Sequence, residues 1–312
     1  MLLWGKSQHF PLRGCNHDQM LNHANTFTLK GGSMHPQPRP GMNHLAHRKE
    51  CEFCFRILAV LILGISLAGC GNTSPSAESG NNKPAARSEG KPVDEATAGS
   101  VIGTIRFDGV IPQMKAINMI DVPNCAKMHS APVLPETVAP GDNGTLQNVI
   151  VYLQGDFSAY SFPQNNTAAK VKQEGCLYSP HVTAVMVGDP LEVVNADSVT
   201  HNINAISRFH QGWNETQLPG SAPIVRHFTR EEIPMIVKCT MHPWMRFYVA
   251  VLDHPYFQVT GKDGQFALRN VPPGSYQLTT WHEAFGTKTQ TIIIQPKQEQ
   301  VVSITYTGKE HP

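Results

Sequence analysis

Short apolar runs, many of them rich in β-branched residues, alternate with turns along the chain from residue 100 onward. Segments 101–109 (VIGTIRFDG) and 148–155 (NVIVYLQG) each end in glycine. Segment 182–195 (VTAVMVGDPLEVVN) predicts two strands around a Gly-Asp-Pro turn, and the tail up to residue 308 predicts at least four more. Since no helical period stands out, the pattern predicts an all-β protein made of two sandwiches.

The first part of the chain has a different pattern. Residues 55–70 (FRILAVLILGISLAGC) form an apolar run with basic residues just ahead of and inside its start. A basic start, a short apolar stretch and small residues before a cleavage point are typical of a secretory signal, here 42–70. The ending Leu-Ala-Gly-Cys resembles the bacterial lipobox, which implies that Cys70 is lipidated and becomes the mature N-terminus. The alternative, a transmembrane helix, needs roughly 20 apolar residues, more than this run contains.

Two further stretches lack the pattern of a folded domain. Residues 1–41 show no periodicity, and Met42 would begin a signal of ordinary length, so 1–41 is expected to be a spurious extension. A zinc site built on Cys51 and Cys54 would lack its second pair of ligands. Residues 71–99 contain almost no large apolar residue, so they predict a disordered tether.

Composition limits the kind of partner more than the fold. The chain has 312 residues, a formal net charge of +1 and only 16% charged residues. This balance gives no reason to expect nucleic acid or a strongly charged partner. The abundance of Gly (25) and Pro (24) fits a β protein rich in turns.

Four cysteines remain at and after the end of the signal: Cys70, Cys125, Cys176 and Cys239. Thiols tend to pair in the oxidising compartment that an exported chain enters. If Cys70 carries lipid and Cys239 binds a metal, Cys125 and Cys176 are left to form a disulfide. The alternative is that both are free and buried.

The segment 238–247 (KCTMHPWMRF) concentrates ligands for a soft metal. Cys239, His242 and Met245, each separated from the next by two residues, lie on a loop between two predicted strands. His201, in the sequence NADSVTHNINA, supplies a second imidazole from another strand end. Two imidazoles, one thiolate and one weak thioether are the ligand set that suits copper in electron transfer.

Three other side chains have to be considered as ligands for this site. His181 and His210 are alternative imidazoles, and Met241 lies between the expected ligands. Adjacent residues on a tight loop point in different directions, so Met241 is expected to pack rather than to bind. The alternative without a metal is that Cys239 is an inert thiol and His242 a surface histidine. This alternative leaves His201 and Met245 unexplained.

Residues 165–252 resemble the cupredoxins, or type 1 blue copper proteins. The resemblance rests on Gly-Asp before a strand, Asn-Ala-Asp…Thr-His-Asn, and Cys-Thr-Met-His-Pro-Trp-Met before a last strand, with a ligand loop of the short amicyanin type. It implies a Greek-key sandwich that holds one type 1 copper ion. The equatorial ligands would be His201, Cys239 and His242, and the axial ligand would be Met245.

The same resemblance implies supporting roles for four more residues. Asn202 and Thr240, which follow two of the ligands, are expected to join the ligand segments by a hydrogen bond. Pro243 and Trp244 are expected to surround a partly exposed ring of His242, where electrons would enter.

Residues 258–308 are similar to the carboxypeptidase regulatory-like (transthyretin-like, or prealbumin-like) sandwiches through TGKDGQFALRNVPPGSYQLTTW. That family usually opens with a strand like GSVIGTIRFDG, which here lies far upstream. We therefore expect a discontinuous sandwich made of 100–156 plus 253–308, into which the cupredoxin domain is inserted. The alternative is that 100–156 extends the cupredoxin.

A second polar group lies at the end of one predicted strand. His282 beside Glu283 could form an acid–base pair or a second metal site. Neighbours in a strand point to opposite faces, so the two side chains would not share one target. The expectation is therefore that Trp281 packs at a corner while the His-Glu pair is solvated.

Together these features predict an exported one-electron carrier, lipid-anchored to a bacterial membrane and facing the periplasm or the cell exterior, with redox proteins as partners. Copper handling without electron transfer is the alternative. Metal-delivery proteins often rely on Met and His alone, so Cys239 favours the carrier. Copper enzymes need further copper bound by His-x-His or similar pairs. No such pair follows residue 70, so an enzyme is not expected.

Overall fold

The computed structural model describes residues 90–310. The expectations for 1–41 and 42–70, including Cys51, Cys54 and the lipidation of Cys70, lie outside the described residues. Within 90–310, no helix has the length and apolar character required to cross a membrane. Strands make up 47% of the structure and helix 3%, so the expected all-β fold is confirmed.

The described residues contain sixteen strands, one short α-helix and one 3-10 turn. They are β1 (Gly99–Phe107), α1 (Pro123–Ala126), η1 (Asp142–Gly144), β2 (Ile150–Gln154), β3 (Ala169–Glu174), β4 (Leu177–Ser179), β5 (Val182–Met186), β6 (Pro190–Asn195), β7 (His201–Ile206), β8 (Asn214–Gln217), β9 (Ile224–His227), β10 (Glu232–Lys238), β11 (Arg246–Leu252), β12 (Phe257–Val259), β13 (Gln265–Val271), β14 (Gly274–His282), β15 (Gly286–Ile294) and β16 (Glu299–Tyr306).

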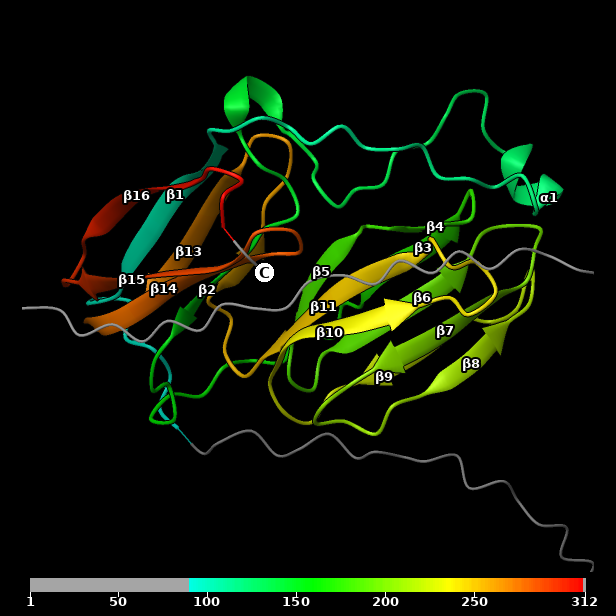
Figure 1. The fold of residues 1–312 in the computed structure, drawn as a ribbon. Coiled ribbons are helices and arrows are strands. Elements are labelled where there is room, and N and C mark those ends of the chain that lie inside the picture. The colour runs from blue at the N-terminus through cyan, green and yellow to red at the C-terminus, as the bar shows by residue number, and fades with distance from the viewer. Residues whose placement is uncertain (1–89, 311–312) are drawn as a thin grey trace, which may run out of the picture. The chain divides into compact units, whose positions relative to one another are not determined.

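One sandwich, here called the split sandwich, combines strands from both ends of the described chain (Figure 1). Its sheets have the orders β13-β1-β16 and β12-β2-β14-β15. β1 pairs antiparallel with β13 and parallel with β16, while β2 pairs with β12 and β14. This is the pairing expected of a discontinuous sandwich. Ile105, Leu153, Leu278 and Tyr306 are among the buried side chains of its core.

The other sandwich, here called the insert sandwich, is formed by the strands between β2 and β12. Its sheets have the orders β4-β3-β6-β9 and β5-β11-β10-β7-β8. β10 and β11 form an antiparallel hairpin, and Val237 and Phe247 are fully buried partners within it. The alternation of buried and less buried residues along β6 sends Val193 into the same core. The hairpin end carries the loop that contains the expected metal ligands.

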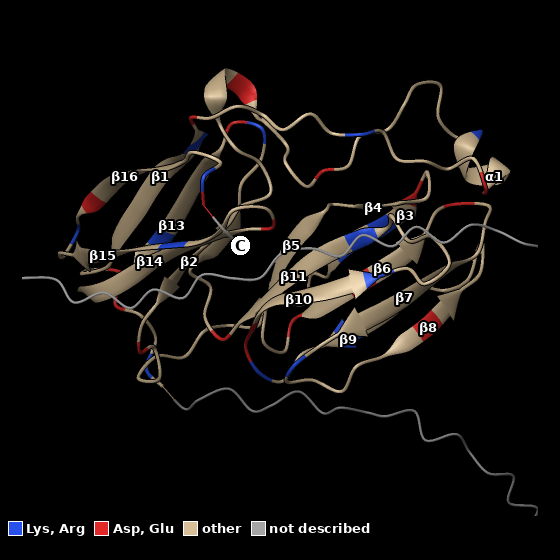
Figure 2. Cartoon of the chain, viewed as in Figure 1, with Lys and Arg blue, Asp and Glu red and all other residues tan. Residues whose placement is uncertain are grey.

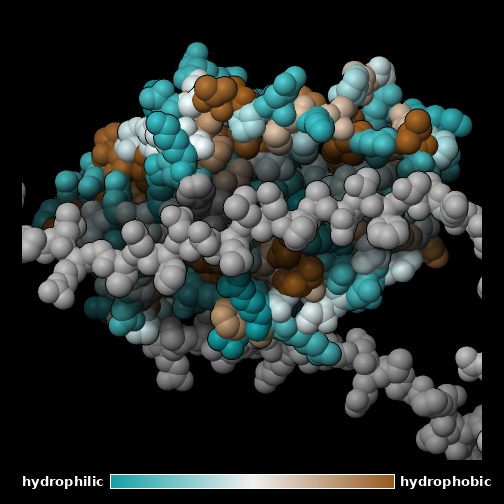
Figure 3. Space-filling view, in the orientation of Figure 1, coloured by the Kyte–Doolittle hydropathy of each residue, from teal (hydrophilic) through white to brown (hydrophobic). Residues whose placement is uncertain are grey.

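The connection from β1 to β2 crosses to the insert sandwich. Within it, residues 117–137, here called the cap segment, place Met119 and Cys125 in the insert core, with Ile117 and Val122 packed against it. The assignment of all of 100–156 to the split sandwich is therefore wrong for this stretch. The cap segment is held there by a few apolar side chains and lacks the alternation of apolar and polar residues that is typical of a strand. In Figure 3 apolar residues lie along the upper edge, where this connection runs in Figure 1.

Residues 90–98 hold backbone contacts to the folded part, although they were expected to belong to the tether. The N–H of Lys91 donates to the carbonyl of Ala159, and the N–H of Ser161 donates back to Lys91, both at 3.0 Å. The carboxylate of Asp94 accepts hydrogen bonds from the N–H of Ala96 and the hydroxyl of Thr97 at 2.9 Å. These local bonds order the chain before β1 begins.

A third apolar cluster joins β2 of the split sandwich to β5 and β11 of the insert sandwich. The ring of Tyr248 lies 5.0 Å from that of Trp281 within this region. Next to it, the imidazole of His181 bonds the carboxylate of Glu283, and both side chains are 9% exposed. His282 is 1% exposed. The solvated His-Glu pair expected from the sequence is therefore wrong, because the partner of Glu283 comes from the other sandwich.

The surroundings of Glu283 favour its ionised form. Burial raises the pKa of Glu283, but hydrogen bonds from His181 and Tyr248 and the charge of Arg246 outweigh it and leave the pKa below its ordinary value. Elsewhere in the described chain, Figure 2 shows positive and negative residues interspersed over both sandwiches.

Candidate metal centre

The loop between β10 and β11 is closed by its own backbone. Lys238 pairs with Arg246 as the last rung of the hairpin. The N–H of Cys239 donates to the carbonyl of Met245 at 3.1 Å, and the N–H of Met245 donates to the carbonyl of His242 at 2.9 Å. These backbone bonds fix the main-chain positions from which the side chains of Cys239, His242 and Met245 extend.

The neighbouring strand β7 brings the fourth residue. β7 pairs antiparallel with β10, which places His201, its first residue, beside the start of the loop. The amide oxygen of Asn202 accepts hydrogen bonds from the N–H of Thr240 at 3.2 Å and from its hydroxyl at 2.9 Å. The hydrogen bond expected between these two segments is therefore present.

Three ligand atoms converge at this point. Nδ1 of His201 lies 3.1 Å from Nδ1 of His242, and Sγ of Cys239 lies 3.5 Å from the same nitrogen. All three ligand atoms are within 4.8 Å of one another. The exposed fractions are 0% for His201, 3% for Cys239, 5% for His242 and 1% for Met245. The described structure thus brings together the ligand atoms of His201, Cys239 and His242 away from water, and Met245 is buried at the end of the same loop.

The spacing of these atoms fits a metal ion. Bond lengths of about 2.0 Å to nitrogen and about 2.3 Å to sulfur, as zinc has, let one ion bridge two nitrogens up to about 4 Å apart. The separations of 3.1 Å and 3.5 Å lie within that reach. A thiolate and two imidazoles, with the thioether of Met245 in the same buried cluster, are the donor set that suits copper.

The protonation of the imidazoles also fits. Nε2 of His201 lies 2.8 Å from Oδ2 of Asp197, and a carboxylate only accepts, so Nε2 carries the proton and Nδ1 offers its lone pair. Burial lowers the pKa of His201 below its ordinary value of 6.5, although Asp197 acts in the opposite direction. Burial and the neighbouring His201 also lower the pKa of His242. Both rings are thus neutral at pH 7, as metal binding requires.

His242 is covered, which corrects the expectation of a partly exposed ring. Its ring centroid lies 5.4 Å from that of Trp244, and the sulfurs of Cys125 and Cys176 lie within 4.8 Å of one of its ring nitrogens. Cys125 and Cys176 form a disulfide, which anchors the cap segment at this place. The ring is therefore hidden by a part of the chain that the sequence did not assign to the site.

Pro243 and Trp244 were expected to surround the place where electrons enter. Pro243 is exposed. Trp244 is half-buried, and its Nε1–H donates to the carbonyl of Cys176 at 2.9 Å. Met241 is 42% exposed, as expected of a residue that points away from the ligands. Any partner would meet Pro243 and Met241 before it met His242.

The rival imidazoles lie elsewhere. His181 bonds Glu283, and His210 stacks edge-on against Phe228 at 5.3 Å between ring centroids. Cys125, Cys176 and His242 are also close enough to hold a metal, but the two sulfurs are joined and cannot act as thiolates while the disulfide is intact.

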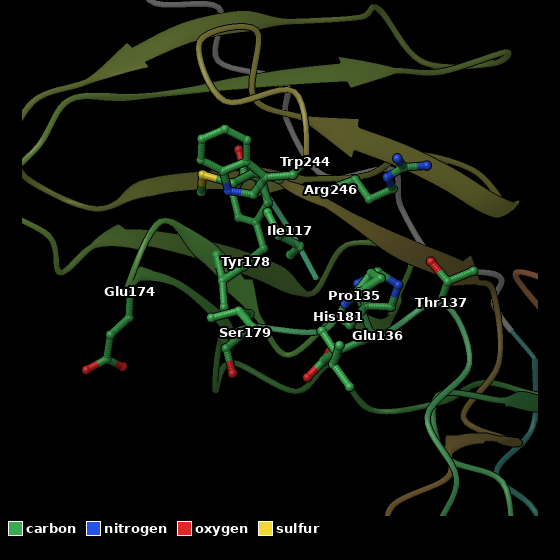
Figure 4. Close-up of a pocket in the computed structure, with 14 residues that line it drawn as sticks. Ile117, Pro135, Glu136, Thr137, Glu174, Tyr178, Ser179, His181, Trp244 and Arg246 are labelled. Carbon is green, nitrogen blue, oxygen red and sulfur yellow. The ribbon is translucent and has the colours of Figure 1, made fainter. Parts of the chain in front are cut away.

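A cavity of 390 Å³ opens beside the metal-ligand loop (Figure 4). Trp244, Met245 and Arg246 line it from the loop side, and Ile117 and residues 133–137 of the cap segment line it from the other. Tyr178 and His181 complete the wall. Met245 therefore contributes to the wall of this cavity although it is only 1% exposed, whereas His242 is not among the lining residues.

Comparisons with known proteins complete this description. No protein-family model matches the chain, and no curated protein matches it. Among solved structures, a copper-containing nitrite reductase of Thermus scotoductus SA-01 aligns at 19% identity over 33% of this chain and 25% of its own, with a TM-score of 0.27. A purple cupredoxin of Nitrosopumilus maritimus aligns at 26% identity over 27% of this chain and 98% of its own, with a TM-score of 0.23. A reduced amicyanin variant aligns at 24% identity over 27% of this chain and 81% of its own, with a TM-score of 0.25.

Proposed function

We propose that this chain binds one type 1 copper ion through His201, Cys239, His242 and Met245 and carries single electrons between redox proteins. The observation that carries the proposal is the meeting of two imidazole nitrogens and one thiol sulfur, 3.1 Å and 3.5 Å apart, in a buried site. Two strands and one loop bring these atoms together, and their order along the chain is that of the resemblance described above.

When bound, the copper ion supplies the one-electron change between Cu(I) and Cu(II). The thiolate of Cys239 suits Cu(I), and the two imidazoles accept Cu(II), so the set serves both states. The backbone bonds within the loop and the contact from Asn202 to Thr240 hold the donors in place in each state. Burial excludes water from the site. Because both imidazoles are already neutral, neither has to release a proton before it binds the ion.

The location of the carrier is part of the proposal. The apolar run 55–70 and its Leu-Ala-Gly-Cys ending favour export with a lipid anchor at Cys70, so that the sandwiches work at the surface of a bacterial membrane. The disulfide between Cys125 and Cys176 supports an oxidising compartment such as the periplasm or the cell exterior.

The test is a visible absorption spectrum of the protein after titration with Cu(II). The wild type should bind one equivalent and show an intense band from Cu(II)–thiolate charge transfer. Cys239→Ser should lose the band, and Met241→Leu, which changes an exposed thioether on the same loop, should keep it. Colourless and loosely held copper in the wild type would refute the carrier and favour copper handling. A band that persists in Cys239→Ser would refute the ligand set.

A further inference from the structure

We propose that Asp197 is a positioning residue of this metal centre: it fixes the tautomer of His201 that can bind copper, and its charge favours the oxidised ion. The inference rests on the proposed function and adds a residue for which the sequence suggested no role. It also links the ligand to the disulfide.

The carboxylate of Asp197 has three donors around it. Oδ2 accepts from Nε2 of His201 and from the N–H of Cys176, both at 2.8 Å, and Oδ1 accepts from the N–H of Gly175 at 2.7 Å. Asp197 is 8% exposed, so these bonds form away from bulk water. A carboxylate with charge-assisted bonds on both oxygens is held firmly in one orientation.

The turn that carries Asp197 is itself fixed. The side chain of Asn195 accepts the N–H of Asp197 at 3.0 Å and donates to the carbonyl of Val199 at 2.9 Å and to that of Gln217 at 3.0 Å. Asn195 ends β6 and His201 begins β7, so the turn between the two strands is braced at both ends. The position of the carboxylate relative to the imidazole is thereby set by the sheet.

This bracing decides which nitrogen of His201 faces the other ligands. Since Nε2–H is committed to Asp197, Nδ1 is unprotonated and points toward Nδ1 of His242. A carboxylate behind a ligand imidazole fixes its orientation and raises its basicity, as in other metal sites. A negative charge so close to the ligand stabilises the more positive metal ion, so it should lower the reduction potential.

The first test needs no copper and no variant. In metal-free wild-type protein, NMR of the imidazole nitrogens should show His201 protonated on Nε2 and unprotonated on Nδ1. A proton on Nδ1 of His201 would overturn the proposal. Because the protein is metal-free, this result does not depend on whether the chain binds copper, so a failure here is distinct from a failure of the proposed function.

The second test separates charge from orientation in the copper-loaded protein. Asp197→Asn keeps an acceptor for His201 but removes the charge, so the tautomer should persist while the ratio of Cu(I) to Cu(II) affinity rises about tenfold, which is roughly 59 mV in midpoint potential. Asp197→Ala should lose the fixed tautomer as well. Asp156→Asn removes an exposed carboxylate that bonds only the nearby Ser158 and serves as the charge control. A potential in Asp197→Asn equal to that of the control would overturn the proposal.

Discussion

The disulfide over His242 gives the most quantitative prediction. Replacing Cys125 and Cys176 together by alanine removes a cross-link that spans 51 residues. The chain-entropy model for a loop of that length gives about 14 cal/mol/K, or about 4 kcal/mol at 25 °C. We expect the double variant to lose this amount from its free energy of unfolding, in addition to the cost of two buried sulfurs.

The assay is urea unfolding of the metal-free protein, followed by the fluorescence of Trp213 and Trp244, which pack against the insert core. Cys239→Ala is the matched control, because Cys239 is a free cysteine that is 3% exposed. Twice its loss estimates the cost of two sulfurs without a cross-link. In the double variant His242 should also become reactive to a histidine reagent, since the cap segment is no longer anchored beside it.

One result would refute this reasoning. If the double variant loses no more than twice the loss of Cys239→Ala, and His242 stays protected, then the cross-link contributes little. The apolar anchors Ile117, Met119 and Val122 would then hold the cap segment by packing alone.

Three further predictions test other parts of the fold. Gly103→Ala should cost about 1–3 kcal/mol of unfolding free energy, because its Cβ would collide with the carbonyl oxygen of Val302. Gly261→Ala, whose Cβ would have its nearest neighbour at 3.7 Å, is the control, and equal costs would contradict the β1–β16 packing. Glu283→Leu should cost about 1–3 kcal/mol by leaving the ring nitrogen of His181 without its buried partner, and an unchanged urea midpoint would count against that contact. Burial lowers the pKa of His282 from 6.5 to about 4, so the unfolded state takes up the proton first as pH falls. The unfolding free energy should therefore fall between pH 6.5 and 4 by up to about 3 kcal/mol, and His282→Phe should flatten this slope in urea titrations.

The sequence predicted the parts of the molecule that depend on local pattern. The strands β10 and β11 and the loop between them follow from apolar runs on either side of KCTMHPWMRF, so Cys239, His242 and Met245 were found together. His201 was found because it follows a predicted strand and a polar turn in NADSVTHNINA, a local pattern that is visible without knowing the strand pairing. The roles of Asn202 and Thr240 were implied by the resemblance to the cupredoxins, through their places directly after two of the ligands.

Features that depend on long-range contact could not be predicted in this way. Asp197 lies four residues before His201, yet its role depends on a turn that also brings it to Cys176. The partners His181 and Glu283 are 102 residues apart, in different sandwiches. The burial of His242 depends on a cap segment without periodicity. A carboxylate at the turn before a ligand strand was the one local signal that could have been followed.

The pairing of the first strand with the last has a consequence for the order of folding. Ser100 of β1 meets Glu299 of β16 across 199 residues, so this sheet cannot close until synthesis of the chain is almost complete. The insert sandwich has all its strands by Leu252, and domains generally fold as units as they emerge. Once it folds, the stretch between β2 and β12 is no longer a flexible loop, and less closure entropy opposes the pairing of Tyr152 with Phe257. The insert sandwich, which carries the metal ligands, can therefore form before β1 pairs with β16.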